Sequence, residues 1–138
     1  MSWYHDGLLV EEIDLKKYAA FVYCITNLKT GRLYIGLKQT SFAKTKQVKG
    51  KKKRFRAESD WREYWSSSEE LKKDVMLLGE DNFKRDILHF CEMKSHANYL
   101  EAREQMDRRV LENPDKYYNG IINCRVSRNH IKKLLEND

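Results

Sequence analysis

The stretch FVYCITNLKTGRLYIGLKQT, residues 21–40, carries the clearest structural pattern in the chain. It divides into two short strands, 20–26 and 32–36, which are joined by a turn containing Lys, Thr and Gly. Each strand carries one tyrosine, Tyr23 and Tyr34, and the second belongs to a Tyr-Ile-Gly sequence. Side-chain alternation assigns the first strand to two faces, with Phe21, Tyr23 and Ile25 on one and Val22 and Cys24 on the other.

Further elements follow this hairpin. A helix is expected over 68–78, because serines precede it as caps, glutamates occupy its first turn and Gly79 follows it. The segment 82–91 has the aromatic and aliphatic density of a third strand. Residues 95–111 predict a long helix that ends before an Asn-Pro pair, and 127–136 predict a short final helix.

Together these elements predict one α/β domain of the α+β kind, spanning residues 1–138 with a core at about 19–124. The expected architecture is a small antiparallel sheet of about three strands flanked by helices. Residues 1–18 are expected to pack on the domain as a lead-in. The segment 41–57 holds eight basic residues and few apolar ones, which predicts a flexible basic loop.

Charge is distributed unevenly along the chain. Thirteen Lys or Arg and no Asp or Glu lie between Leu15 and Ala57, whereas the remainder holds fourteen basic and twenty-one acidic residues. A merely solvated surface normally interleaves both signs, so this one-sided field favours a polyanionic partner such as nucleic acid.

Several classes of protein are disfavoured by the composition. Three widely spaced cysteines without a C-x-x-C pair indicate neither a disulfide framework nor a zinc staple, and the four histidines show no ligand spacing. The first twenty residues contain four acidic side chains and do not resemble a signal peptide. No apolar run approaches the length of a membrane span. We therefore expect a cytoplasmic protein without membrane contact.

The order of these features resembles the GIY-YIG nucleases, in particular the phage-borne, SegE-like group of homing-type endonucleases. The resemblance covers about 21–130 and includes the phrases YIGLK, SDWREYWSSSEELKKDV, DNFKRDILHFC, YLEAREQ and YYNGIIN. The first motif departs from the family, because Phe-Val-Tyr replaces its glycine and isoleucine and only the tyrosine remains. The family's arginine is also absent, and either Lys38 or Lys44 stands in its place.

The resemblance implies a single-metal phosphodiesterase that cuts double-stranded DNA with Mg²⁺ or Mn²⁺. Tyr23 would act as the general base or orient the attacking water, and Tyr34 would position the phosphate or share a hydrogen bond with Tyr23. Lys38, with Lys44 as its rival, would meet the charge that develops on phosphorus. On residue type alone, both tyrosines could equally be ordinary strand aromatics.

The metal ligand implied by the resemblance is Glu101, a hard carboxylate that leaves most coordination positions to water and phosphate. Glu104 lies one turn further on and competes for this role, and either glutamate could simply be solvated. Asn119 would tie the end of the long helix to the active site through its amide. As a turn residue before glycine, it also has a plain structural explanation.

The basic segment and the C-terminal region supply the expected DNA contacts. These would hold the phosphate backbone rather than specify bases, and they come from Lys46, Lys49, Lys51, Lys52, Lys53, Arg54, Arg56 and His130. The oligomeric state stays open between a monomer and a transient dimer on DNA. Two rival functions also remain: a non-catalytic nucleic-acid-binding module on the same fold, and a structural or inhibitory binder of DNA ends.

Overall fold

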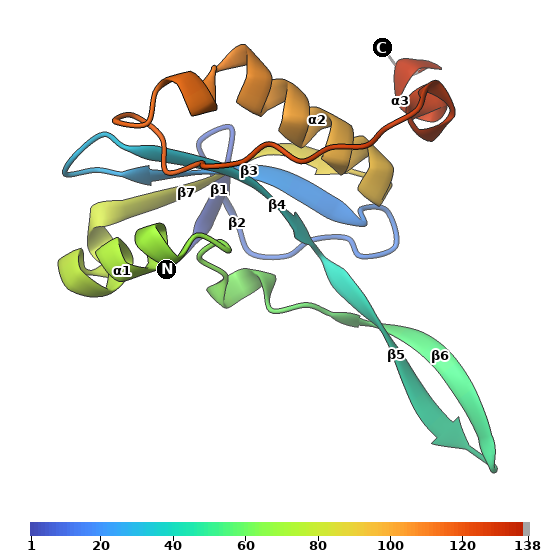
Figure 1. Cartoon of the computed structure of the whole chain (residues 1–138). Coiled ribbons are helices and arrows are strands. Elements are labelled where there is room, and N and C mark those ends of the chain that lie inside the picture. The colour runs from blue at the N-terminus through green and yellow to red at the C-terminus, as the bar shows by residue number, and fades with distance from the viewer. Residues whose placement is uncertain (137–138) are drawn as a thin grey trace.

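The computed structural model describes residues 1–136, whose arrangement is shown in Figure 1. Residues 137–138 of the predicted domain lie outside the described part. A five-stranded sheet with the order β2-β1-β7-β3-β4 forms the centre of the molecule. Its strands are β1 (Trp3–His5), β2 (Leu8–Val10), β3 (Ala20–Asn27), β4 (Leu33–Gln39) and β7 (Phe83–Cys91). A separate two-stranded sheet consists of β5 (Ser41–Val48) and β6 (Lys51–Glu58).

The helices complete an α+β architecture, as the sequence predicted. The α-helices are α1 (Glu69–Leu78), α2 (Lys94–Asp107) and α3 (Lys132–Glu136), and short 3-10 helices cover Trp61–Glu63, Glu80–Asn82, Val110–Glu112 and Arg128–Ile131. Helices α1 and α2 lie on opposite faces of the central sheet (Figure 1). No helix in residues 1–136 combines the length and the apolar character that crossing a membrane requires.

The prediction of a three-stranded sheet was wrong, because the central sheet has five strands. The three expected strands β3, β4 and β7 are present and antiparallel. The segment treated as a lead-in adds β1, which pairs in parallel with β7, and β2, which pairs antiparallel with β1. Trp3 fixes this addition, since its ring is buried and its indole nitrogen donates to the Trp61 carbonyl at 2.8 Å.

Alternation along β3 divides the core as expected. Phe21, Tyr23 and Ile25 belong to the cluster that includes Leu71 and Val75 of α1. On the opposite face, Val22 and Cys24 belong to the cluster that includes Ala97 and Leu100 of α2. One eight-residue strand therefore supplies both cores, and it holds the sheet between the two helices.

The boundaries of α1 confirm the capping prediction. The Ser68 side chain accepts a hydrogen bond from the Leu71 amide at 3.3 Å, and Gly79 ends the helix with a φ of 89°. Helix α2 ends earlier than predicted, at Asp107. Arg109 adopts a left-handed φ of 54°, and the chain then forms a 3-10 turn that buries Val110. The final helix begins as a 3-10 turn before continuing as α3.

The segment 41–57 is not the flexible loop that the sequence predicted, because it forms the β5–β6 ribbon. This antiparallel hairpin projects away from the central sheet (Figure 1). Its two-residue turn, Lys49-Gly50, has φ values of 51° and 76°, the positive pair that matches the twist of a hairpin. Lysines occupy both strands and hide the alternation from which a strand is usually predicted.

Candidate active site

Three tyrosines gather on the α1 face of the sheet. Tyr23 of β3 lies opposite Gly36 of β4, and its ring centroid is 6.1 Å from that of Tyr34. The third, Tyr64, comes from the loop before α1 and meets Tyr23 edge to face, with centroids 6.0 Å apart. Tyr64 could not be predicted from the sequence, because its place in this cluster depends on contacts between distant segments.

Gly36 lets these phenols approach the sheet. A Cβ added at this position would lie 2.4 Å from the Tyr23 hydroxyl oxygen and 2.8 Å from Cε1 of Tyr34. Any side chain here would therefore collide with both rings. The glycine of the Tyr-Ile-Gly sequence is therefore required both by Tyr34, two residues before it, and by Tyr23, opposite it on β3.

The two phenols differ in access to solvent. Tyr23 is 1% exposed, and burial, together with the nearby Tyr34 and Tyr64, raises its pKa well above the ordinary value. Tyr34 is partly exposed, and its hydroxyl lies 3.3 Å from the Ser67 hydroxyl. Burial also raises the pKa of Tyr34. Both side chains are therefore neutral phenols at physiological pH, suited to hydrogen bonding.

Lys38 extends this cluster along β4. Its ammonium donates to an Asp60 carboxylate oxygen at 2.5 Å and lies 4.0 Å from the centroid of the Tyr64 ring. The hydrogen bond from Lys38 lowers the pKa of Asp60. Lys44 instead stands exposed on the β5–β6 ribbon. Of the two candidate replacements for the family arginine, the structure brings Lys38 to the tyrosines.

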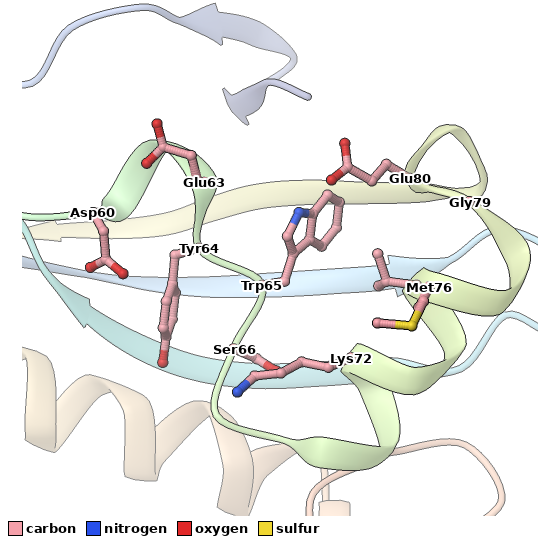
Figure 2. Close-up of a pocket in the computed structure, with 10 residues that line it drawn as sticks. Asp60, Glu63, Tyr64, Trp65, Ser66, Lys72, Met76, Gly79 and Glu80 are labelled. Carbon is pink, nitrogen blue, oxygen red and sulfur yellow. The ribbon is translucent and has the colours of Figure 1, made fainter.

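A hollow of about 670 Å³ lies beside Tyr64, between the loop before α1 and α1 itself. Figure 2 shows its lining, with Trp65 between Tyr64 and Met76. The charged side chains around it are Asp60, Glu63, Lys72 and Glu80. Three carboxylates against one ammonium make this hollow a poor receptor for phosphate, and none of the predicted catalytic residues lines it.

A smaller cavity of about 140 Å³ brings together three of the predicted site residues. It is lined by Tyr34, Glu101 and Asn119, along with Gln105 of α2. Burial raises the pKa of Glu101 to about 7. A carboxylate in this position lacks compensation for its negative charge, which a bound cation would provide.

Glu104 faces a different environment, although it lies on the same helix. Its carboxylate accepts from His89 Nε2 at 2.8 Å and from Arg108 Nε at 3.1 Å. Partial burial alone would raise the pKa of Glu104, but these hydrogen bonds lower it. Glu104 is therefore engaged in ion pairs, whereas Glu101 lines the cavity beside Tyr34.

Asn119 holds the backbone of Ile35, the residue between Tyr34 and Gly36. Its side chain accepts from the Ile35 amide at 3.0 Å and donates to the Ile35 carbonyl at 2.8 Å. Gln105 donates to the same carbonyl at 3.0 Å. Because β4 is an edge strand, these two amides satisfy backbone groups that would otherwise lack a partner strand. Gln105 was not identified from the sequence, since nothing in its local pattern indicates this contact.

The predicted DNA contacts fall into two separate places. Exposed cations on the β5–β6 ribbon are Lys46, Lys49, Lys51, Lys52, Lys53, Arg54 and Arg56. His130 is also exposed but belongs to the 3-10 turn before α3, where its Nδ1 accepts from the Ser127 amide at 3.2 Å. Figure 1 shows α3 well apart from the ribbon.

The residues fit a singly anchored divalent cation rather than a closed cage. Within residues 1–136, no group of three or more His, Cys, Asp or Glu side chains is placed to hold a metal. Glu101 offers one hard oxygen ligand beside the Asn119 and Gln105 amides. Mg²⁺ commonly binds through one or two carboxylates and fills its remaining positions with water and phosphate.

Comparison with known proteins assigns the chain to a family. The family model described as "Putative endonuclease segE, GIY-YIG domain" matches residues 3–122. Searches of curated proteins and of solved structures found no match. The matched region includes the tyrosine cluster, the β5–β6 ribbon, Glu101 and Asn119. The chain therefore belongs to the SegE family of GIY-YIG endonuclease domains.

Proposed function

We propose that this protein is a metal-dependent endonuclease that hydrolyses phosphodiester bonds of double-stranded DNA. One observation carries the proposal: Glu101 and Asn119 line a cavity with Tyr34, whose ring packs against Tyr23. Family membership supports a nuclease, and a nuclease domain implies DNA as its substrate.

Glu101 is the residue that would hold the metal, Mg²⁺ or Mn²⁺. When bound, the ion supplies Lewis-acid polarisation of the phosphate and stabilises charge on the leaving oxygen. The raised pKa of Glu101, about 7, is consistent with a buried carboxyl that keeps its proton near neutral pH until a cation replaces it. Asn119 and Gln105 are positioning residues, because they fix the Ile35 backbone between Tyr34 and Gly36.

Tyr23 acts as a neutral hydrogen-bonding group that orients the attacking water. Its pKa lies well above the ordinary value, so a tyrosinate base would be costly to form. Tyr34 is more accessible and holds a non-bridging phosphate oxygen through its hydroxyl. The buried phenol of Tyr23 would thus contact the attacking water, and the partly exposed phenol of Tyr34 would contact the substrate.

Lys38 supplies positive charge on the same face. Its present partner, Asp60, has a side chain that is 63% exposed, against 10% for that of Lys38, so this carboxylate can leave the pair for water. A phosphate oxygen that reaches Lys38 can then replace Asp60 as the partner of the ammonium. The cation then meets the charge that develops on phosphorus.

Nicking of supercoiled plasmid tests the proposal. We expect wild-type protein to convert it to open circles with Mg²⁺ or Mn²⁺ and not with EDTA, and Glu101→Gln to be inactive with either ion. Wild-type protein that binds the plasmid but never nicks it would favour the non-catalytic binding module instead. Equal nicking by wild type and Glu101→Gln would remove Glu101 from the site.

A further inference from the structure

The β5–β6 ribbon has two chemically different faces. Residues directly opposite each other in an antiparallel pair share a face, so the register assigns every side chain. The lysine face comprises Phe42, Lys44, Lys46, Val48, Lys51, Lys53, Phe55 and Ala57. The arginine face comprises Ser41, Ala43, Thr45, Gln47, Lys52, Arg54, Arg56 and Glu58.

Charge repulsion is concentrated on the lysine face. Lys46 lies directly opposite Lys53, with Lys44 and Lys51 as diagonal neighbours on the same face. Like charges placed opposite each other destabilise a strand pair, and an isolated two-stranded ribbon is marginal even without them. In the absence of a partner, nothing on this face offsets the repulsion between the lysines. A polyanion lying along it would relieve the repulsion.

The base of the lysine face adjoins the candidate active site. Lys38, on the tyrosine face of β4, has its ammonium 5.1 Å from the centroid of the Phe42 ring. Only Thr40 separates the end of β4 from the start of β5, and its amide remains bonded to the Ala19 carbonyl at 3.0 Å. DNA bound at the tyrosines therefore has the lysine face as its neighbour.

We propose that the β5–β6 ribbon enters the major groove of B-form DNA with its lysine face toward the base edges. This inference rests on the proposed DNA-cutting function, whose substrate contacts it extends. The B-form major groove is about 12 Å wide and admits a two-stranded ribbon, whereas the major groove of duplex RNA is too narrow. Lysine ammonium groups are suited to the guanine O6 and N7 acceptors exposed there.

The length of the ribbon sets where it would contact DNA. Lys46 follows Gly36 by ten residues, which span at most about 33 Å at about 3.3 Å per residue. This distance is about one turn of B-form DNA. The protein should therefore read sequence on one side of its cut, within about ten base pairs of it.

Binding measurements in EDTA test the proposal without cleavage. The probes are one duplex in plain form, the same duplex with bulky C5-substituted pyrimidines that fill the major groove, and the plain duplex with netropsin in its minor groove. We expect at least tenfold weaker binding to the first modified duplex and less than a twofold change with netropsin. An A-form RNA duplex should also bind at least tenfold more weakly. Equal affinity for the plain and the major-groove-filled duplex, or for the RNA duplex, would overturn the proposal.

Two matched variants test the face. Changing Lys44, Lys46, Lys51 and Lys53 to Gln should remove most of the difference in affinity between the plain and the major-groove-filled duplex, because contacts to base edges are lost. Changing Lys52, Arg54 and Arg56 to Gln should leave most of that difference in place, because these side chains lie on the opposite face. The reverse ranking would overturn the assignment of faces, and no change in either would overturn the ribbon as a DNA contact. Plasmid nicking with Mg²⁺ is scored separately, so a failure of the ribbon is distinguishable from a failure of the nuclease.

Discussion

Strand β4, which carries part of the tyrosine face of the central sheet, leads directly into the β5–β6 ribbon. The functional side chains of the two regions nevertheless differ in how firmly the structure holds them. Tyr23 is 1% exposed, and its ring and that of Tyr34 leave no room for a side chain at Gly36. The ribbon instead carries exposed cations on strands without a core of their own. One region fixes a geometry by burial, and the other provides charge without fixing it.

Because of this contrast, we expect mutations to affect DNA cleavage and DNA binding separately. Changes on the tyrosine face or at Glu101 should remove catalysis while DNA still binds. Changes on the ribbon should weaken binding while a saturated enzyme still cuts.

Glu101→Gln should abolish metal-dependent nicking and leave DNA binding at least as tight as in wild type, because one negative charge near the phosphate disappears. Its melting temperature should not fall. The folded-state pKa of about 7 lies above the ordinary value, so ionised Glu101 costs stability as the pH rises toward and past 7. Without metal, the melting temperature of the variant should therefore rise relative to that of wild type as the pH increases from about 5 to about 8. A loss of melting temperature at pH 8 would contradict this account.

Glu104→Gln is the matched control on the same helix. It should cut DNA normally but lose stability at neutral pH, because His89 and Arg108 stabilise the ionised carboxylate. That contribution is present above the unfolded-state pKa and disappears as the pH falls through the lowered folded-state pKa. An inactive Glu104→Gln with an active Glu101→Gln would exchange the two assignments.

Tyr23→Phe should reduce the single-turnover rate by about 10²–10³-fold, the range typical of losing one positioned hydrogen-bonding group. The fold should persist, since only a hydroxyl is removed from a buried ring. Tyr18→Phe is the control, because Tyr18 packs against Phe90 away from the three clustered tyrosines. Full activity in Tyr23→Phe would reduce this tyrosine to sheet packing and break the contrast between the two regions.

Much of this fold could be predicted from the sequence, where the pattern was local. Strand β3 alternates between two cores, and α1 carries its own cap and stop. The three-residue strand β1 could not be predicted, because it exists only through its pairing with β7. The β5–β6 ribbon was missed for another reason. Lysines and arginines occupy both of its faces, so the sequence lacks the regular alternation of apolar and polar residues that predicts a strand.

The candidate site divides in the same manner. Tyr23, Tyr34 and Glu101 were predicted from the family resemblance, and the structure places Tyr34 and Glu101 around one cavity. Tyr64 and Gln105 were not found, since each acts through a residue far away in the sequence: Tyr64 meets Tyr23, and Gln105 meets Ile35. Non-local contacts leave no mark on the local sequence pattern.

The pH dependence of metal use should be smaller than the effect of removing a residue. A carboxylate must lose its proton to bind a cation, so Mg²⁺ affinity should fall as the pH drops below about 7. The half-saturating Mg²⁺ concentration should rise by nearly tenfold per pH unit below that point. Fluorescence or calorimetric titration without DNA measures this directly. An affinity independent of pH between 5.5 and 8 would show that Glu101 is not the ligand.

Gly36→Ala should destabilise the protein by about 1–3 kcal/mol, the usual cost of forcing a methyl group into a packed site. The new Cβ would lie 2.4 Å from the Tyr23 hydroxyl oxygen, so the ring must move and nicking should slow as well. Gly120→Ala is the stability control, because no atom lies within 4 Å of its added Cβ. Chemical denaturation of both variants measures the difference, and equal stabilities would mean that the tyrosines shift without cost.

The smallest effect is expected on the saturated rate when ribbon cations are removed. Changing Lys51, Lys52, Lys53 and Arg54 to Ala removes charge from both faces, so the salt slope of DNA binding should flatten. Cleavage at saturating protein should nevertheless stay within about twofold of wild type, because none of these side chains lines the cavity of Glu101. Changing Arg125, Arg128, Lys132 and Lys133 to Ala removes the same charge from the C-terminal region, and a larger loss of slope there would transfer the main DNA contact to the surroundings of His130. A large loss of saturated rate in the ribbon variant, with the slope unchanged, would show that the ribbon positions the scissile phosphate, and the separation between geometry and charge would fail.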